Sequence, residues 1–240
     1  MDSPTFRTGM AQVRFEELWL LEIVVGSHPP YHGWIPFRNL PDDVQDDPDK
    51  MGNHADINFY SHHMPDEQLL DELYHLLTTG EIIGAVVRSG WPPDSLFVPS
   101  RAEIQDAFNW DNYSWLSYTL TEKGFARWED YAKPNWDKFR CKGGCGSEDE
   151  THYATAANPH VAEYWFKWAT YGRNVDFSRA SYEEISPWQV FPFKTLPRGV
   201  KARLPIIAMN NYEQESYDDI LREIEPWYQR SVADWKTEAV

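Results

Sequence analysis

Histidine and aspartate side chains gather ahead of the first clear helical pattern, and imidazole and carboxylate groups can bind a transition metal. The members of this group are His54, Asp56, His62 and His63, with His28 and His32 further upstream. His54 and Asp56 are two residues apart, so on a strand their side chains would share one face. No His-Glu-x-x-His pattern accompanies them, and neutral loop histidines are the favoured interpretation. A metal-dependent enzyme built on this region is one alternative for the function.

The two cysteines, Cys141 and Cys145, flank a Lys-Gly-Gly turn. The segment resembles one of the two ligand pairs of a zinc knuckle. Tetrahedral zinc needs two more ligands, and the nearest candidates are His152 and His160. No second cysteine pair is present, and His160 falls just inside a predicted helix. We therefore favour packing or surface cysteines over zinc ligands.

Other chemical motifs are incomplete. Asp47, Asp49 and Gly52 match three positions of a calcium loop, but Met51 stands at position five and Asn58 replaces the bidentate Glu at position twelve. No phosphate-binding glycine loop and no Gly-x-Ser-x-Gly elbow occurs in the sequence. We predict no cofactor, and a binding protein rather than an enzyme.

The charge of the chain indicates the kind of partner it would attract. With 22 Lys and Arg against 38 Asp and Glu, the formal net charge is −16. Such a field repels nucleic-acid phosphates and anionic lipid surfaces and favours a basic protein. An acidic, proline-punctuated loop supplies the candidate contacts, Asp42, Asp43, Asp46 and Asp47. The leading hypothesis is an immunity-like or regulatory partner of a basic protein.

Aromatic residues are abundant, at 15% of the chain with 12 Trp. Surplus aromatic rings often mark contact surfaces, but an aromatic core is the more common arrangement. We expect most of these rings to be buried.

The hydrophobic pattern predicts a mixture of helices and strands. Phe15–Val25 reads as a buried strand or a short helix. Asp66 is placed to cap a helix with an apolar stripe of five leucines, Leu69, Leu70, Leu73, Leu76 and Leu77. Ser100 and Glu103 form a capping-box pattern for a helix through Phe108, and Thr121 can cap another. A helix from Asn158-Pro159 to Gly172 would place Val161, Trp165, Trp168 and Ala169 on one face, and a last helix runs from Ser216 to Pro226. Strands are predicted at 81–88, 116–120 and 200–204, and in the last of these apolar residues alternate with Lys201 and Arg203. The glycine-rich stretch 141–149 reads as a linker.

A short segment resembles a known family. Tyr118 to Gly124, Tyr-Thr-Leu-Thr-Glu-Lys-Gly, is similar to the last wing strand of winged-helix proteins and the helix that follows it. With Trp128 and Glu129 it resembles uncharacterised bacterial proteins that carry Leu-Thr-x-x-Gly-x-x-x-Trp-Glu, as does the later segment 188–198. Locally, Thr121 would cap the helix and Gly124 would allow close packing.

The resemblance implies a DNA-binding ancestry and, as another alternative, a winged-helix transcription regulator. The expected recognition helix, Arg101–Asn109, carries one Arg against Glu103 and Asp106. Residues 67–138 hold six Lys or Arg and twelve Asp or Glu, whereas phosphate contacts need the opposite balance. We therefore expect nucleic-acid binding to be absent.

These observations predict an α+β fold: an irregular N-terminal region at 1–59 packed on the core, a winged-helix-like module at 60–140 and a second α+β region at 151–240. The longest apolar run, Leu18–Val25, is too short to cross a bilayer. Two cysteines are too few for a disulfide scaffold, so a reducing cytoplasm is the expected compartment. Neither the partner nor the oligomeric state follows from the sequence.

Overall fold

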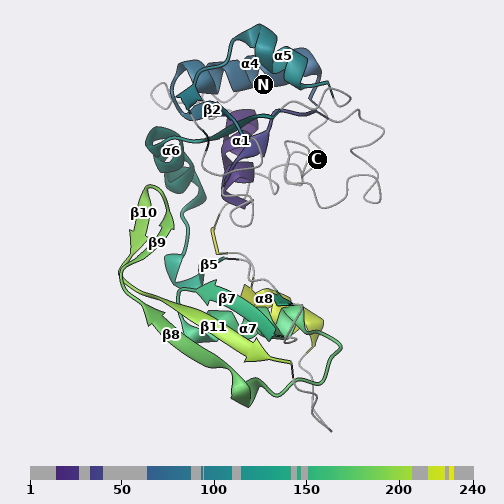
Figure 1. The fold of residues 1–240 in the computed structure, drawn as a ribbon, viewed down its shortest axis with the longest axis vertical. Coiled ribbons are helices and arrows are strands. Elements are labelled where there is room, and N and C mark those ends of the chain that lie inside the picture. The colour runs from purple at the N-terminus through teal and green to yellow at the C-terminus, as the bar shows by residue number, and fades with distance from the viewer. Residues whose placement is uncertain are drawn as a thin grey trace, which may run out of the picture. The chain divides into compact units, whose positions relative to one another are not determined.

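The computed structural model describes residues 15–26, 33–39, 64–87, 93, 95–109, 115–141, 145–146, 151–206, 216–224 and 227–229. The chain divides into two compact units. Unit 1 comprises Met1–Gly26, Trp34–Gly124 and Val232–Val240, and unit 2 comprises Ser27–Gly33 and Phe125–Ser231. Both units combine helices with antiparallel strands, which confirms the α+β class (Figure 1).

Unit 1 is built on a sheet with the strand order β1-β4-β2-β3. The strands are β1 (Ile35–Pro36), β2 (Ile82–Val86), β3 (Leu96–Phe97) and β4 (Leu116–Leu120). Its helices are α1 (Phe15–Gly26), α4 (Asp66–Thr78) and α5 (Arg101–Ala107), followed by α6 (Glu122–Ala132), which begins in this unit. β4 pairs with β1 on one side and β2 on the other, so it lies at the centre of the sheet.

The apolar segment at 15–25 is the buried helix α1. Between Leu18 and Val25 every apolar side chain is at most 5% exposed, so α1 is apolar on all sides, as expected of a core helix. The Tyr118 hydroxyl on β4 donates a hydrogen bond to the Leu20 carbonyl, 3.3 Å away. The structure thus decides between the two interpretations of Phe15–Val25, a buried strand or a short helix, which a continuous apolar run leaves open.

The sequence signals for α4 are confirmed except at its start. All five leucines of the predicted stripe are buried, and Gly80 follows the helix with φ +73°. The N-cap is Pro65, which lacks a capping side chain, and Asp66 instead accepts a 2.7 Å hydrogen bond from Asn39. The prediction that Asp66 caps the helix is therefore wrong, because a tertiary contact uses its carboxylate.

The Leu-Thr-x-x-Gly segment joins β4 to α6 by the local interactions that its residues predict. Thr121 Oγ accepts the Gly124 amide at 3.3 Å, and donates to the Gly80 carbonyl at 2.7 Å. A Cβ atom at position 124 would lie 2.0 Å from the Glu81 carbonyl oxygen, so only glycine fits this approach. These contacts give Thr121 and Gly124 of the motif a structural role: Thr121 caps the helix and Gly124 allows the close packing.

Unit 2 contains a five-stranded antiparallel sheet in the order β5-β7-β11-β8, with β6 also pairing with β7. Its strands are β5 (Arg140–Cys141), β6 (Cys145–Gly146), β7 (Thr151–Ala156), β8 (Ser181–Ile185) and β11 (Gly199–Pro205). A separate hairpin consists of β9 (Trp188–Phe191) and β10 (Lys194–Leu196). The segment 141–149 is therefore wrongly predicted as a linker, since its residues 141 and 145–146 pair with β7.

Helices cover one face of this sheet (Figure 1). α7 (Pro159–Ala169) packs Ala162, Trp165 and Phe166 against alternate residues of β7 and β11. α8 (Tyr217–Ile224) lies beside α7. Two short 3-10 helices, η1 (Trp136–Lys138) and η2 (Phe177–Arg179), precede β5 and β8. Val200, Ala202 and Leu204 are buried and Lys201 and Arg203 exposed, which confirms the predicted alternation of β11.

A second core in unit 2 is made of aromatic rings. Phe139 lies 4.8–5.6 Å, between ring centroids, from Trp136, Trp188, Phe191 and Trp227. Trp128 and Phe125 from α6 are fully buried or nearly so and are 5.7 Å apart. The expectation of an aromatic core is thus met within the described residues, because these rings form one contacting group.

Candidate functional site

Three aromatic side chains at one end of α7 and α8 stay exposed. Trp168 and Tyr171, at the end of α7, are 42% and 46% exposed, and Tyr217, the first residue of α8, is 41% exposed. The rings of Tyr171 and Tyr217 are 4.9 Å apart in an edge-to-face arrangement. Tyr171 donates its amide to the Trp168 carbonyl at 3.2 Å, in the turn that ends α7. We call Trp168, Tyr171 and Tyr217 the aromatic patch.

The sequence pattern placed Trp168 on the buried face of α7, together with Trp165, and this is wrong. The buried residues are Ala162, Trp165 and Phe166. His160, Tyr164 and Trp168 recur every four residues and form a separate row on the helix. That row is the sequence signal for the exposure of Trp168, because its residues are offset from the ones that face the sheet.

Charged side chains on the same two helices as the aromatic patch are paired with one another. Asp219 interacts with Arg222 at 2.8 Å, and Lys167 with Glu163 at 3.1 Å. Ser216 donates a hydrogen bond to Asp219, which lowers the pKa of that carboxyl, with Arg222 adding to the effect. The adjacent charges are therefore of both signs, and the distinguishing property of the patch is its exposed aromatic area.

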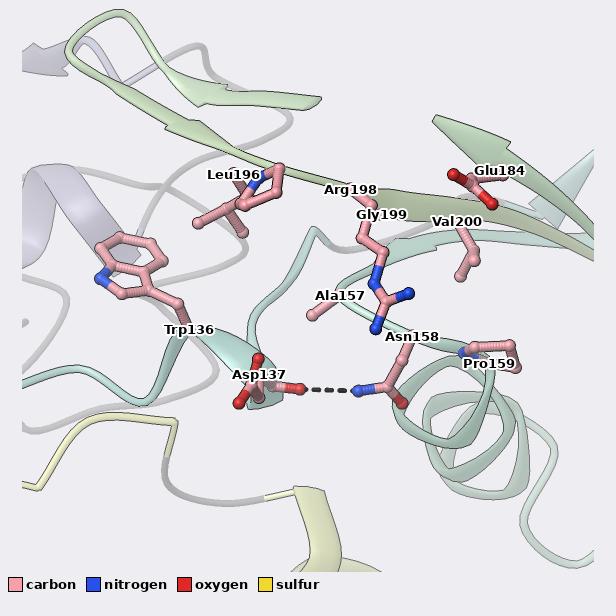
Figure 2. A pocket seen from close by; sticks show the side chains of 11 residues that line it. Trp136, Asp137, Ala157, Asn158, Pro159, Glu184, Leu196, Arg198, Gly199 and Val200 are labelled. Carbon is pink, nitrogen blue, oxygen red and sulfur yellow. Dashed lines mark hydrogen bonds between the residues drawn. The ribbon is translucent and has the colours of Figure 1, made fainter. Parts of the chain in front are cut away.

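A pocket of about 930 Å³ opens near the start of α7 (Figure 2). Its apolar lining comes from Trp136, Ala157, Pro159, Leu196, Pro197 and Val200. Asn158 caps α7 by accepting the Val161 amide at 3.1 Å, and it donates to the Asp137 carbonyl at 2.9 Å. Arg198 extends toward Asn158 and makes no ion pair within the described residues (Figure 2).

The lining of this pocket combines apolar area with charged groups. Its charged side chains are Asp137, Glu184 and Arg198, and no Ser, Thr, Cys or His lines it. The pocket can accommodate a side chain that combines an apolar stem with a polar end, and Glu184 connects it to strand β8.

The structure places the two cysteines on short strands, β5 and β6, that both pair with β7. On β7, Thr155 is opposite Cys141 and His152 is opposite Cys145. Burial raises the pKa of the Cys141 thiol to about 12. His160 lies on α7, 66% exposed, with Nε2 3.8 Å from Glu223.

His152 is buried against α7. It is 8% exposed, its ring centroid is 6.0 Å from that of Trp165, and neither ring nitrogen has a hydrogen-bond partner among the described residues. Burial lowers the pKa of His152, and the nearby positive charge of Arg173 lowers it further. This histidine is therefore a neutral part of the core.

The structure does not describe the other predicted site residues. Asp42, Asp43, Asp46, Asp47, His54, Asp56, His62 and His63 lie outside the described residues. Unit 1 does bury Glu17, whose carboxylate is 3.4 Å from Nε2 of His75 on α4. No group of three potential metal ligands occurs in the part of the chain that the structure describes.

The expected recognition helix is α5, which is short and whose Arg101 is paired with carboxylates. α5 has seven residues and begins with a complete capping box between Ser100 and Glu103. The Arg101 guanidinium binds Glu67 at 2.9 Å and also pairs with Asp71, both on α4. These two carboxylates compete with any phosphate for Arg101.

Comparisons with protein-family models, with curated proteins and with solved structures find no match to this chain. Among the described residues, no helix combines the length and apolar character needed to span a membrane. The winged-helix resemblance and the functions considered for the sequence stay predictions.

Proposed function

We propose that this chain is a protein-binding protein whose partner is a basic protein, in an immunity-like or regulatory role in the cytoplasm. The observation that carries the proposal is the aromatic patch. Exposed Trp and Tyr side chains bury large areas at small entropic cost and dominate the binding energy of many interfaces. Their faces also accept Arg and Lys through cation–π contacts.

The net charge supports the choice of a basic partner. A chain at −16 attracts cationic proteins over long distances and speeds their encounter, whereas the aromatic rings provide short-range anchoring. Asp42, Asp43, Asp46 and Asp47 remain the predicted acidic contacts. The pocket at the start of α7 could receive a basic side chain, since its lining includes Asp137 and Glu184 beside apolar residues.

The proposal is tested by affinity capture with the tagged full chain, followed by mass spectrometry at moderate salt. We expect one stoichiometric basic protein. Truncating two anchors, in Trp168→Ser with Tyr171→Ser, should reduce its recovery at least about tenfold, since such anchors are each worth about 2 kcal/mol.

The matched control is Leu96→Ser with Val98→Ser, which removes two side chains that are 60% and 51% exposed in unit 1. Circular dichroism confirms that both variants are folded. Equal recovery with the patch variant and the control variant, or no captured protein, would contradict the proposal. Charge reversal of the four aspartates tests their contribution in the same assay.

A further inference from the structure

Strand β8 forms an open edge of the unit 2 sheet. It is the last strand in the order β5-β7-β11-β8 and pairs only with β11 among the described strands (Figure 1). Within the described residues, no strand occupies its other side. The outer side of an edge strand presents unpaired backbone amides and carbonyls at alternate residues, and these groups can form a ladder with an added strand.

The side chains of β8 are exposed and acidic. Four of its five residues are exposed, and the strand reads Ser-Tyr-Glu-Glu-Ile. The side chains of Glu183 and Glu184 form no ion pair or hydrogen bond in the described part of the chain. As consecutive residues they project on opposite faces of the sheet. Both faces of this edge therefore carry an available carboxylate.

The surroundings of the two carboxylates differ. Glu184 pairs in register with the buried Val200 and lines the pocket at the start of α7. Glu183 is in register with Lys201 on the exposed face. Tyr182 is 39% exposed. Burial raises the pKa of its hydroxyl, the negative charge of Glu163 on α7 raises it further, and the positive charge of Lys167 opposes the rise. The edge thus offers one aromatic and two acidic positions in sequence.

Charges on an edge strand also prevent aggregation between identical chains. Carboxylates at these positions repel a second copy of β8, whose own Glu183 and Glu184 would lie nearby. They favour a strand of opposite charge, because oppositely charged cross-strand pairs stabilise an antiparallel ladder. Charge complementarity therefore selects the occupant.

We infer that β8 binds an extended segment of the basic partner by strand addition, and that this segment carries two consecutive Lys or Arg residues. One basic residue faces Glu183 on the exposed side of the sheet. The next faces Glu184, with its apolar stem over the pocket wall formed by Val200. This inference rests on the basic partner of the proposed function and assigns it a docking strand distinct from the aromatic patch.

The test uses the full chain labelled with ¹⁵N and a capped peptide with the sequence Val-Thr-Lys-Arg-Thr-Val. We expect saturable binding, with slowed hydrogen exchange at alternate amides of residues 181–185. A peptide with Glu-Glu in place of Lys-Arg should not bind. Substituting both carboxylates, Glu183→Gln with Glu184→Gln, should weaken binding about tenfold. The variant loses two cross-strand charge pairs, each worth about threefold in affinity.

The control variant is Glu122→Lys, which changes the net charge by the same two units at an exposed position in α6. Its affinity for the peptide should stay within about twofold of the unmodified chain, because screening weakens distant charges. Absence of binding, protection outside β8, or equal weakening by both variants would overturn the inference.

Affinity capture separates this inference from the proposed function. If the patch variant loses the partner but Glu183→Gln with Glu184→Gln retains it fully, the strand-addition inference is wrong and the proposed function stands. If no partner is captured while the Lys-Arg peptide still protects β8, the proposed function fails and the docking strand stands.

Discussion

At the scale of single residues, His152 makes the free energy of unfolding depend on pH. Its lowered pKa means that the folded chain resists a proton that the unfolded chain accepts. Stability should therefore decline as the pH falls below about 6.5, the value for an unperturbed histidine, and the decline should stop below the folded-state pKa.

We expect His152→Phe to remove this part of the pH dependence while keeping a ring against Trp165. The slope that is lost is at most about 1.4 kcal/mol per pH unit. Urea unfolding at pH 7.5, 6.5, 5.5 and 4.5 measures it. His160→Phe, which removes an exposed imidazole from the same unit, is the control. Identical slopes in the His152→Phe variant and the unmodified chain would contradict the assignment.

Cys141 should be a poorly reactive thiol. With a pKa of about 12, its thiolate fraction at pH 8 is on the order of 10⁻⁴, roughly a thousandfold below that of a free cysteine. In a Cys145→Ser variant, reaction with a disulfide reagent at pH 8 should be slower than that of free cysteine by a similar factor. Adding urea should restore rapid reaction; fast labelling of the folded variant would show that burial does not suppress the thiolate.

At the scale of elements, the turn from β4 into α6 depends on Gly124. A methyl group there would overlap the Glu81 backbone carbonyl, and backbone atoms cannot move aside as the end of a side chain can. We expect Gly124→Ala to reduce the free energy of unfolding by about 3 kcal/mol, at the upper end of the usual cost of overpacking.

Urea unfolding of Gly124→Ala and Gly26→Ala measures this difference. At Gly26 an added Cβ meets nothing within 4 Å, so that variant should be close to the unmodified chain. If the two variants unfold alike, close approach is not the reason for glycine at position 124.

At the scale of the whole molecule, the charge balance and the pairing of Arg101 oppose DNA binding. A net charge of −16 repels the phosphate backbone, and α5 presents no cation free of carboxylate neighbours. Fluorescence anisotropy with a labelled 20-base-pair duplex at low salt should show no binding. A salt-sensitive rise in anisotropy would instead favour the winged-helix regulator.

The sequence alone determined several local features of this chain. The leucine stripe predicted α4, the Ser100 and Glu103 pair predicted the cap of α5, and Asn158-Pro159 predicted the start of α7. These predictions succeed because caps and apolar periodicity involve residues within one or two turns of each other. The α+β class follows from the same local signals.

Tertiary structure decided the features on which the proposed function depends. β8 becomes an open acidic edge only because β11 pairs with it on one side, and no local pattern distinguishes it from a loop. Trp168 is exposed and Trp165 buried because the sheet covers one side of α7 and α8 covers only part of the other. Burial and strand pairing depend on residues distant in sequence, so the candidate surfaces could be identified only once the chain was folded.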